Sequence, residues 1–272
     1  MRIIFSILTA AVVLTSCITD NSADVQSGDS RYGVFIGADE DKLLSICGYD
    51  VLIIDAENLT SDDIAEIHRN GNAKIYSYMN IGAVEEFREY YEQFLPYTLG
   101  AYENWEDERW VDVSSEKWQE HIALTAEMLA DKGIDGIFAD NADVYYVYPD
   151  EKIYLGLMDI FDIFSVREID VMVNGGDSFI RKAIDENSLP DCIKAVNQET
   201  VFTSIDFENG SFGEQTAEER EYFKEYAELC SRSGLKVYIL EYGADTGLRN
   251  EITDYCRKMG YECFFADSLE LD

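Results

Sequence analysis

The residues of this chain that are best suited to chemistry are acids and amides that stand where apolar segments end. The clearest case is the run Asp135–Asn141, an apolar segment that finishes on Asp140 and Asn141. In barrels of parallel strands, the working residues collect at the carboxyl ends of the strands. Asp140 is therefore the first residue that we expect to be functional. The residues found at all such ends are Asp55, Glu57, Tyr78, Asn80, Asp140, Asn141, Asn174, Glu199, Glu241, Tyr242 and Asp267.

Several carboxylates at one edge of a sheet favour the cleavage of glycosidic bonds. In that reaction one carboxylic acid protonates the leaving oxygen, and a second carboxylate acts as nucleophile or base. Sugar rings also need flat apolar surfaces, which Trp105 and the tyrosines that follow Asp140 could supply. Trp110 and Trp118 could do the same, although packing beneath the sheet is the alternative place for both.

The chain has few of the residues on which other classes of enzyme depend. The chain has 2 histidines, His68 and His121, and no CxxC spacing, so we expect no zinc site and no cofactor. A divalent-metal enzyme that uses Asp55, Asp140 and Asp143 is an alternative, because clustered carboxylates suit Ca²⁺ or Mg²⁺. Of the 6 cysteines, an odd number remains once the one near the N-terminus is set aside, so they cannot all pair within one chain, and the sequence assigns no particular disulfide.

Eight apolar segments are predicted to be β-strands. Val51–Ile54 and Val237–Leu240 are continuous apolar runs, as expected of strands that are covered on both faces. The predicted strands are Tyr32–Ile36, Val51–Asp55, Ala73–Met79, Gly136–Ala139, Asp170–Val173, Ala195–Phe202, Lys236–Leu240 and Glu262–Ala266.

Helical patterns lie between these strands, and several begin at a capping residue such as Ser61, Ser115 or Thr216. Gly133 ends the helix before Asp140, where a left-handed cap is expected. Alternation of strand and helix over about 240 residues predicts a single (β/α)₈ TIM barrel of the α/β class. A doubly wound open sheet is the alternative. The predicted helices cover residues 39–46, 60–69, 83–93, 115–132, 152–166, 177–187, 216–233 and 246–259.

The N-terminus indicates export. An apolar run, Ile3–Leu14, is too short to span a bilayer, and small residues lead from it to Cys17. This pattern resembles a bacterial lipoprotein signal with acylation of Cys17; an ordinary secretory signal is the alternative. We therefore expect an exported lipoprotein of the bacterial cell envelope, periplasmic or on the cell surface. Its parts are a signal peptide at 1–16, a flexible tether at 17–31 and a glycosidase-like domain at 32–272.

The charge of the chain restricts its partners. The formal net charge is −34, from 55 acidic and 21 basic residues. Such a charge repels the phosphate backbone of nucleic acid, but it attracts a cationic polymer. We expect a polysaccharide partner that could carry ammonium groups, contact with a membrane only through an N-terminal lipid anchor, and a monomer.

Six short segments follow one another in an order typical of a known family. They are Lys74–Tyr78, Gly82–Arg88, Trp110–Val113, Asp135–Asn141, Gln198–Phe202 and Glu241–Tyr242. Together they resemble glycoside hydrolase family 114, the endo-α-1,4-polygalactosaminidases and related bacterial glycosidases. The resemblance spans roughly residue 50 to the C-terminus, and its most specific part is the segment that ends on Asp140 and Asn141. It implies a (β/α)₈ barrel with two catalytic carboxylates.

By motif position, the resemblance implies that Asp140 and Glu199 are the catalytic pair. Fungal members carry a glutamate directly after the asparagine, so Gln198 is the alternative position for the second acid. Lys74 could pair with Asp55 or Asp140 and hold that carboxylate ionised. The predicted substrate-binding residues are Asp55, Lys74, Tyr78, Asn141, Tyr145, Asn174, Glu241 and Tyr242.

The resemblance implies an exported hydrolase of α-linked amino-sugar polysaccharide, similar to an endo-α-1,4-polygalactosaminidase. Two carboxylates would perform the reaction, and their separation would decide between retention and inversion at the anomeric carbon. The alternative is a surface lipoprotein that binds glycan without cleaving it.

Overall fold

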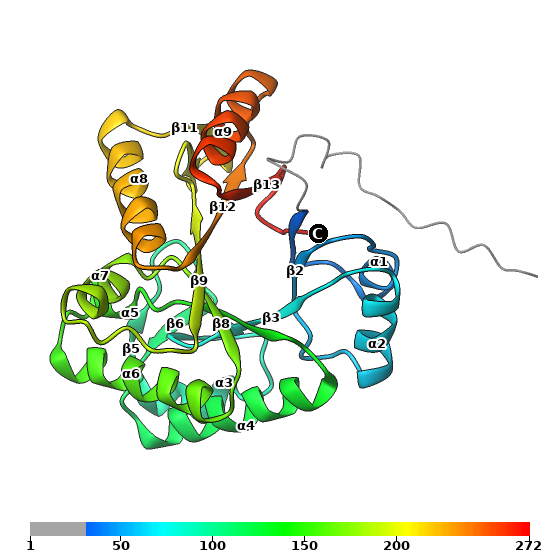
Figure 1. Ribbon diagram of the computed structural model, residues 1–272. Helices are drawn as coiled ribbons and strands as arrows, with labels where there is room; N and C mark the ends of the chain where they lie inside the picture. Colours follow the sequence, from blue (N-terminus) through cyan, green and yellow to red (C-terminus); the bar gives the residue numbers. More distant parts are fainter. Residues whose placement is uncertain (1–30) are drawn as a thin grey trace, which may run out of the picture.

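Eight parallel strands form the central sheet of the computed structural model, which describes residues 31–272 (Figure 1). Their order in the sheet is β1-β2-β3-β7-β8-β9-β12-β13, which is also their order along the chain. The strands are β1 (Tyr32–Phe35), β2 (Val51–Ile54), β3 (Ile75–Asn80), β7 (Gly136–Asp140), β8 (Asp170–Asn174), β9 (Ile193–Glu199), β12 (Lys236–Tyr242) and β13 (Glu262–Ala266).

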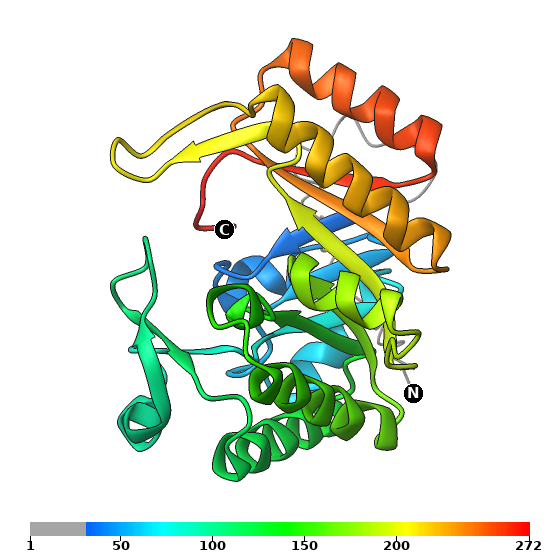
Figure 2. The same cartoon turned by 90° about the vertical axis from the view of Figure 1, so that its left-hand side faces the viewer.

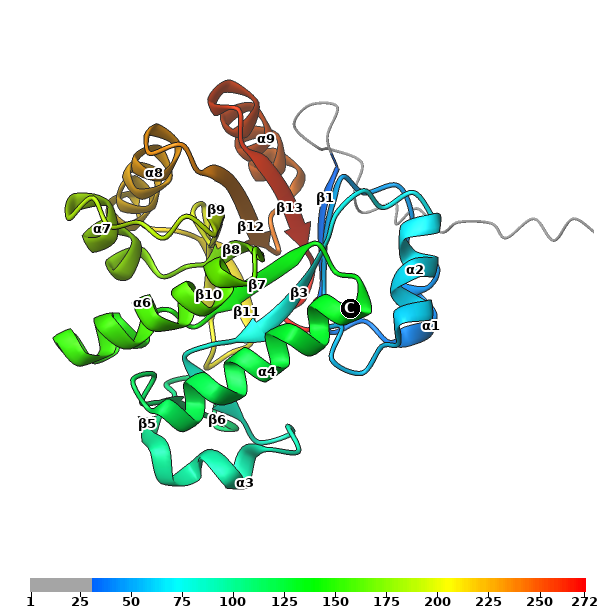
Figure 3. The same ribbon diagram turned by 60° about the horizontal axis from the view of Figure 1, so that its bottom comes forward.

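The sheet curls until its first and last strands lie side by side. The ring of Tyr32 on β1 lies 6.4 Å from that of Phe264 on β13, and 4.7 Å from that of Tyr238 on β12. Figure 3 shows the strands gathered around a centre with the helices outside them. The predicted (β/α)₈ barrel is confirmed, and the open sheet that was its alternative is wrong.

Helices cover the outside of the barrel because each has one apolar face. α4 buries Trp118, Ile122, Ala126 and Leu129, and Gly133 ends it with a φ of 97°, the left-handed cap that the sequence predicts. The helices are α1 (Glu40–Leu43), α2 (Ser61–Arg69), α3 (Tyr91–Phe94), α4 (Glu116–Lys132), α5 (Val144–Val147), α6 (Glu151–Val166), α7 (Asp177–Asp185), α8 (Ala217–Arg232) and α9 (Thr246–Met259), with a 3₁₀ turn at Leu95–Tyr97.

Two insertions interrupt the alternation of strand and helix. Between β3 and α4, the strands β4 (Ala83–Glu85), β5 (Thr98–Ala101) and β6 (Glu108–Val111) form a small antiparallel sheet in the order β4-β6-β5. After β9, β10 (Thr203–Asp206) and β11 (Ser211–Glu214) form a hairpin. In Figure 2 the yellow hairpin and the blue-green connection between β5 and β6 extend to the same side of the molecule.

The first insertion overturns one prediction. A helix was expected at 83–93, but residues 83–85 are strand β4 and only Tyr91–Phe94 are helical. Val84 pairs with Arg109 of β6, so partners distant in sequence override the local helical pattern. The buried indole of Trp118 fixes the start of this insertion, because its Nε1 donates to the carbonyl of Ile81 at 2.8 Å.

Three other observations concern the N-terminal and cysteine predictions. The signal peptide, and the tether up to residue 30, lie outside the described residues. Within residues 31–272, no helix is both long and apolar enough to cross a membrane. The cysteines of that range are all buried, namely Cys47, Cys192, Cys230, Cys256 and Cys263.

Candidate active site

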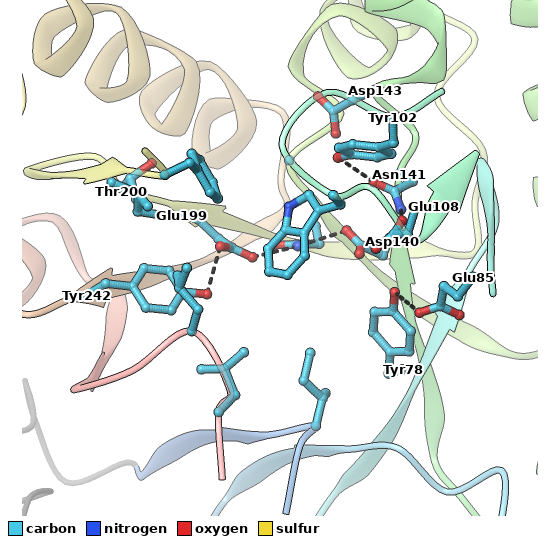
Figure 4. A pocket seen from close by; sticks show the side chains of 18 of the residues that line it. Tyr78, Glu85, Tyr102, Glu108, Asp140, Asn141, Asp143, Glu199, Thr200 and Tyr242 are labelled. Atoms are coloured by element: carbon cyan, nitrogen blue, oxygen red, sulfur yellow. Dashed lines mark hydrogen bonds between the residues drawn. The ribbon is translucent and has the colours of Figure 1, made fainter. Parts of the chain in front are cut away.

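Four neighbouring strands bring their last polar residues together at one end of the barrel. Asp140 ends β7, Asn174 ends β8, Glu199 ends β9 and Tyr242 ends β12. The Nδ2 of Asn174 donates to Oδ1 of Asp140 at 2.9 Å and to Oε1 of Glu199 at 2.8 Å. Figure 4 shows the side chains of Asp140 and Glu199 pointing toward each other from their two strands. One amide nitrogen therefore holds both acids.

The distances on this nitrogen limit how far apart the two acids can be. Because Asp140 Oδ1 and Glu199 Oε1 lie 2.9 Å and 2.8 Å from the same atom, they are no more than about 5.7 Å from each other. Tyr242 fixes the other oxygen of Glu199, since its hydroxyl donates to Oε2 at 2.8 Å.

A hydrogen-bond chain inside the barrel sets the orientation of the Asn174 amide. Asn197 donates its Nδ2 to Oδ1 of Asn174 at 2.7 Å, and its own Oδ1 accepts from the hydroxyl of Tyr32 at 3.0 Å. Asn197 is fully buried. Because the oxygen of Asn174 already accepts from Asn197, its NH₂ group faces the two acids.

Burial makes both acids easier to protonate. Burial, and then the charge of Glu199, raise the pKa of Asp140 to about 6, against the lowering effect of hydrogen bonds from Asn174 and the Asn141 backbone. Burial also raises the pKa of Glu199. Because the two acids interact, they lose their protons in two steps, and the pKa of each step is a property of the pair and not of either residue alone. Between those steps the pair holds one proton, which is the state that a catalytic acid and a carboxylate partner need.

The first insertion supplies an acid that sequence analysis missed. The Oε2 of Glu108, on β6, lies 3.4 Å from Nδ2 of Asn141 and 3.3 Å from Nδ2 of Asn80. Burial, and then the charge of Asp140, raise the pKa of Glu108 to about 8. Tyr102 joins this group, because its hydroxyl donates to Oδ1 of Asn141 at 3.0 Å. The family resemblance included Trp110–Val113. It left out Glu108, although Glu108 begins the same strand.

A buried cation organises the side of the site next to β2 and β3. Arg88 has a side chain only 6% exposed, and it forms ion pairs with Glu85 at 2.8 Å, with Asp55 at 2.9 Å and with Glu57. Tyr78 extends the cluster, since its hydroxyl donates to Glu85 at 3.1 Å.

Glu241 was predicted to bind substrate, and the structure contradicts this. Its side chain is fully buried, and its oxygens accept hydrogen bonds from the backbone amides of Phe202 and Thr203, each at 2.8 Å, and from the Thr203 hydroxyl. These bonds fix the turn after Glu199, in which Thr200 has a φ of 53°. A β-branched residue is strained in that region, so Glu241 is a residue that positions the Glu199 turn.

Two more predicted binding residues lie away from the acids. Lys74 stands before β3, at the opposite end of the barrel from Asp140, and contacts Asp170 at 3.7 Å, so the proposed pairing with Asp55 or Asp140 is wrong. Tyr145, on α5, packs its ring 5.6 Å from that of Tyr154 on α6 and is not part of the cavity lining. The next residue, Tyr146, lines the cavity instead and is 70% exposed.

The remaining predicted residues line one cavity of about 900 Å³. This is the upper part of the range of roughly 300–1,000 Å³ that ligand sites occupy. Arg88 is the single basic residue of its lining, and it is already paired with carboxylates. The sequence-predicted residues in the lining are Asp55, Tyr78, Asp140, Asn141, Asn174, Glu199 and Tyr242, and Gln198 lies beside them.

The acids proposed for a metal do not converge. Asp55 pairs with Arg88, while Asp143 accepts from the backbone amide of Gly176 at 3.0 Å. Across residues 31–272, no group of three or more His, Cys, Asp or Glu side chains has the arrangement of a metal site.

Sequence comparison identifies one family. The model described as glycoside-hydrolase family GH114 matches residues 19–172, which is more than half of the chain. No protein of curated function matches the chain in sequence.

Solved structures share the fold at low sequence identity. The glycoside hydrolase domain of PelA from Pseudomonas aeruginosa has a TM-score of 0.73 at 18% identity, over 90% of this chain and 97% of that domain. Ega3 from Aspergillus fumigatus, solved with galactosamine, has a TM-score of 0.68 at 15% identity, over 89% of this chain and 92% of that one. The α-galactosidase TtGalA from Thermus thermophilus is more distant, with a TM-score of 0.53 at 11% identity, over 88% of this chain and 57% of that one.

Removing the cation of the Arg88 cluster should destabilise the protein. Arg88→Met leaves the buried carboxylate of Glu85 without its partner, and we expect a loss of about 3–5 kcal/mol in the free energy of unfolding. Chemical denaturation would measure it. Lys117→Met is the control, because Lys117 and Glu120 are exposed and their pair should contribute almost nothing. Equal losses in the two variants would contradict this account of the cluster.

Stability should fall as the pH rises from 5 to 8. Burial raises the pKa of Asp143 to about 7 and that of Glu108 to about 8, both above their values in the unfolded chain. The folded protein therefore binds these protons more tightly, and that advantage is lost as the pH passes each folded pKa. Melting temperatures measured from pH 5 to 8 should decrease, and Glu108→Gln should reduce the slope. A melting temperature that rises over this interval would refute the assignment.

Proposed function

Because the chain belongs to glycoside-hydrolase family GH114 and is a glycoside hydrolase, we propose that Asp140 and Glu199 are its catalytic pair. The observation that supports them most is the shared hydrogen-bond donor, Asn174 Nδ2, which lies 2.9 Å and 2.8 Å from the two carboxylates. Gln198 cannot replace Glu199 in this role, because it has no carboxylate and its Nε2 donates to the backbone carbonyl of Glu199.

The separation of the acids favours retention of configuration. Retaining glycosidases keep their carboxyl groups about 5–5.5 Å apart, whereas inverting enzymes need about 6.5–9.5 Å to admit a water molecule. The nearest oxygens of the two carboxylates, which Asn174 keeps within about 5.7 Å of each other, are closer than the spacing of inverting enzymes. One carboxylate attacks the anomeric carbon while the other acid gives its proton to the departing oxygen. Water then releases the sugar, with the second residue acting as base.

The substrate that fits the cavity best is an α-linked amino-sugar polysaccharide, similar to polygalactosamine. Acidic side chains dominate the lining, and its single arginine is already paired. Ammonium groups of a deacetylated chain would be attracted to this surface. That Ega3 was solved with galactosamine agrees with this choice. Tyr78, Asn141, Asn174 and Tyr242 would hydrogen-bond the sugar.

We also propose that the enzyme works outside the cytoplasm, as a monomer held to the cell envelope by an acylated Cys17. The support is the sequence pattern of residues 1–31, a signal of 1–16 followed by a polar tether. On this proposal, residues 32–272 form the catalytic domain.

Azide rescue would test the pair and divide the two roles. Asp140→Ala and Glu199→Ala should each lower turnover of an α-1,4-galactosamine polymer by at least ~100-fold. With an activated aryl α-glycoside, azide should restore reaction in both. The variant without the nucleophile should release the β-glycosyl azide, because azide attacks the α-glycoside directly and inverts it once. The variant without the acid should release the α-glycosyl azide, because the enzyme nucleophile and then azide each invert the anomeric carbon. Nuclear magnetic resonance would identify each product.

Glu225→Gln serves as the control for this experiment, because Glu225 is exposed and lies outside the cavity lining. The same azide anomer from both alanine variants would contradict the assigned pair. Binding of the polymer by the unmodified protein without release of product would instead support a glycan-binding lipoprotein.

A further inference from the structure

Two exposed aromatic side chains meet above the cavity from opposite insertions. Trp105 lies in the connection between β5 and β6, and Phe207 lies at the tip of the β10–β11 hairpin. Their rings are 6.0 Å apart at 75°, an edge-to-face contact. Trp105 is 38% exposed and Phe207 41%, and both line the cavity. Figure 2 shows the two insertions reaching toward each other beyond the strand ends.

Local hydrogen bonds close the two turns that carry these rings. The Trp105 carbonyl accepts from the amide of Glu108 at 3.1 Å, which closes a tight turn. Asp206 closes the other tip, because its side chain accepts from the backbone amides of Glu208 and Asn209, each at 3.1 Å. These bonds fix the backbone of the two tips, and the contact between the rings is what orients their side chains.

Each ring is joined to one of the two catalytic acids by a short path. Trp105 precedes Glu108, whose carboxylate accepts from Asn141, the residue after Asp140. Phe207 follows the turn that Glu241 fixes directly after Glu199. The contact between the rings therefore joins the two insertions across the cavity, farther out than the two acids.

We infer that Trp105 and Phe207, which touch edge to face, form an aromatic clamp whose exposed ring faces together bind one sugar unit of the substrate chain, next to the unit that the acids cleave. A pyranose ring has an apolar face that packs on aromatic rings, and exposed aromatic side chains gain most from being covered in this way. The hairpins project beyond the strand ends, so the unit held by the clamp lies farther out than the unit between Asp140 and Glu199. This inference rests on the proposed function, because it requires a carbohydrate chain in the cavity.

The clamp predicts a dependence on chain length. Trp105→Ala and Phe207→Ala should each raise the KM for an α-1,4-galactosamine hexamer about tenfold. Their loss in kcat/KM should be much larger on the hexamer than on an aryl monoglycoside, which cannot reach the clamp. The double variant should lose less than the two single losses combined, because each ring supports the other. Leu99→Ala is the control, since Leu99 is exposed on β5 but lies outside the cavity lining.

Fluorescence gives a binding measurement that does not need turnover. Trp110 and Trp118 are 4% and 0% exposed, so Trp105 is the tryptophan that acrylamide can reach. In Asp140→Asn, the hexamer should protect the fluorescence from acrylamide, and this protection should disappear when Trp105→Phe is added. Phe207→Ala should increase quenching before any ligand is added.

The outcomes separate the clamp from the proposed function. Cleavage of the hexamer without protection of Trp105, or equal losses on hexamer and monoglycoside, would overturn the clamp and leave the hydrolase in place. Protection of Trp105 by a hexamer that the unmodified protein never cleaves would support the clamp and refute the proposed reaction.

Discussion

One amide nitrogen sets the geometry on which the rest of the site depends. Asn174 can face Asp140 and Glu199 together because Asn197 donates to its oxygen from inside the barrel, while the hydroxyl of Tyr32 donates to the oxygen of Asn197. The chain of donors crosses from β1 through β9 to β8, so it forms only when the sheet has curled and closed. Two acids that would repel each other in the same cavity are thereby held within reach of one anomeric carbon. The arrangement of the proposed catalytic pair therefore depends on hydrogen bonds that require a closed barrel.

The barrel supplies the acids, whereas the insertions supply much of what surrounds them. Glu108 and Tyr102 come from the small sheet between β3 and α4, and both contact Asn141. The hairpin after β9 brings Phe207 over the opposite side. Glu241 fixes the turn from which this hairpin begins, and Thr200 holds a strained backbone within it. This division agrees with the general rule that barrel enzymes vary their substrates through loops while the strand ends keep the chemistry.

The sequence predicted the barrel well, because its strands are continuous apolar runs and each of the eight is present near its expected place. It predicted Asp140, Asn174, Glu199 and Tyr242 at strand ends for the same reason. It failed where long-range pairing decides the structure: residues 83–85 pair with β6, so the helix expected there does not form. It also misplaced Glu241, because a strand end alone does not reveal whether a side chain meets backbone amides or solvent. Lys74 was misplaced for another reason, since it precedes β3 and therefore lies at the opposite end of the barrel from Asp140. Glu108 was missed because its strand belongs to an insertion.

The central claim is that two carboxylates held by Asn174 are close enough for a double displacement. The most direct test is to follow hydrolysis of an α-1,4-galactosamine oligomer by ¹H nuclear magnetic resonance and to read the configuration of the first product before it mutarotates. The account predicts that the α-anomer is released first. Initial release of the β-anomer would contradict the account, because it would mean that water attacks the anomeric carbon directly. Two acids whose nearest oxygens are no more than about 5.7 Å apart leave too little room for that water.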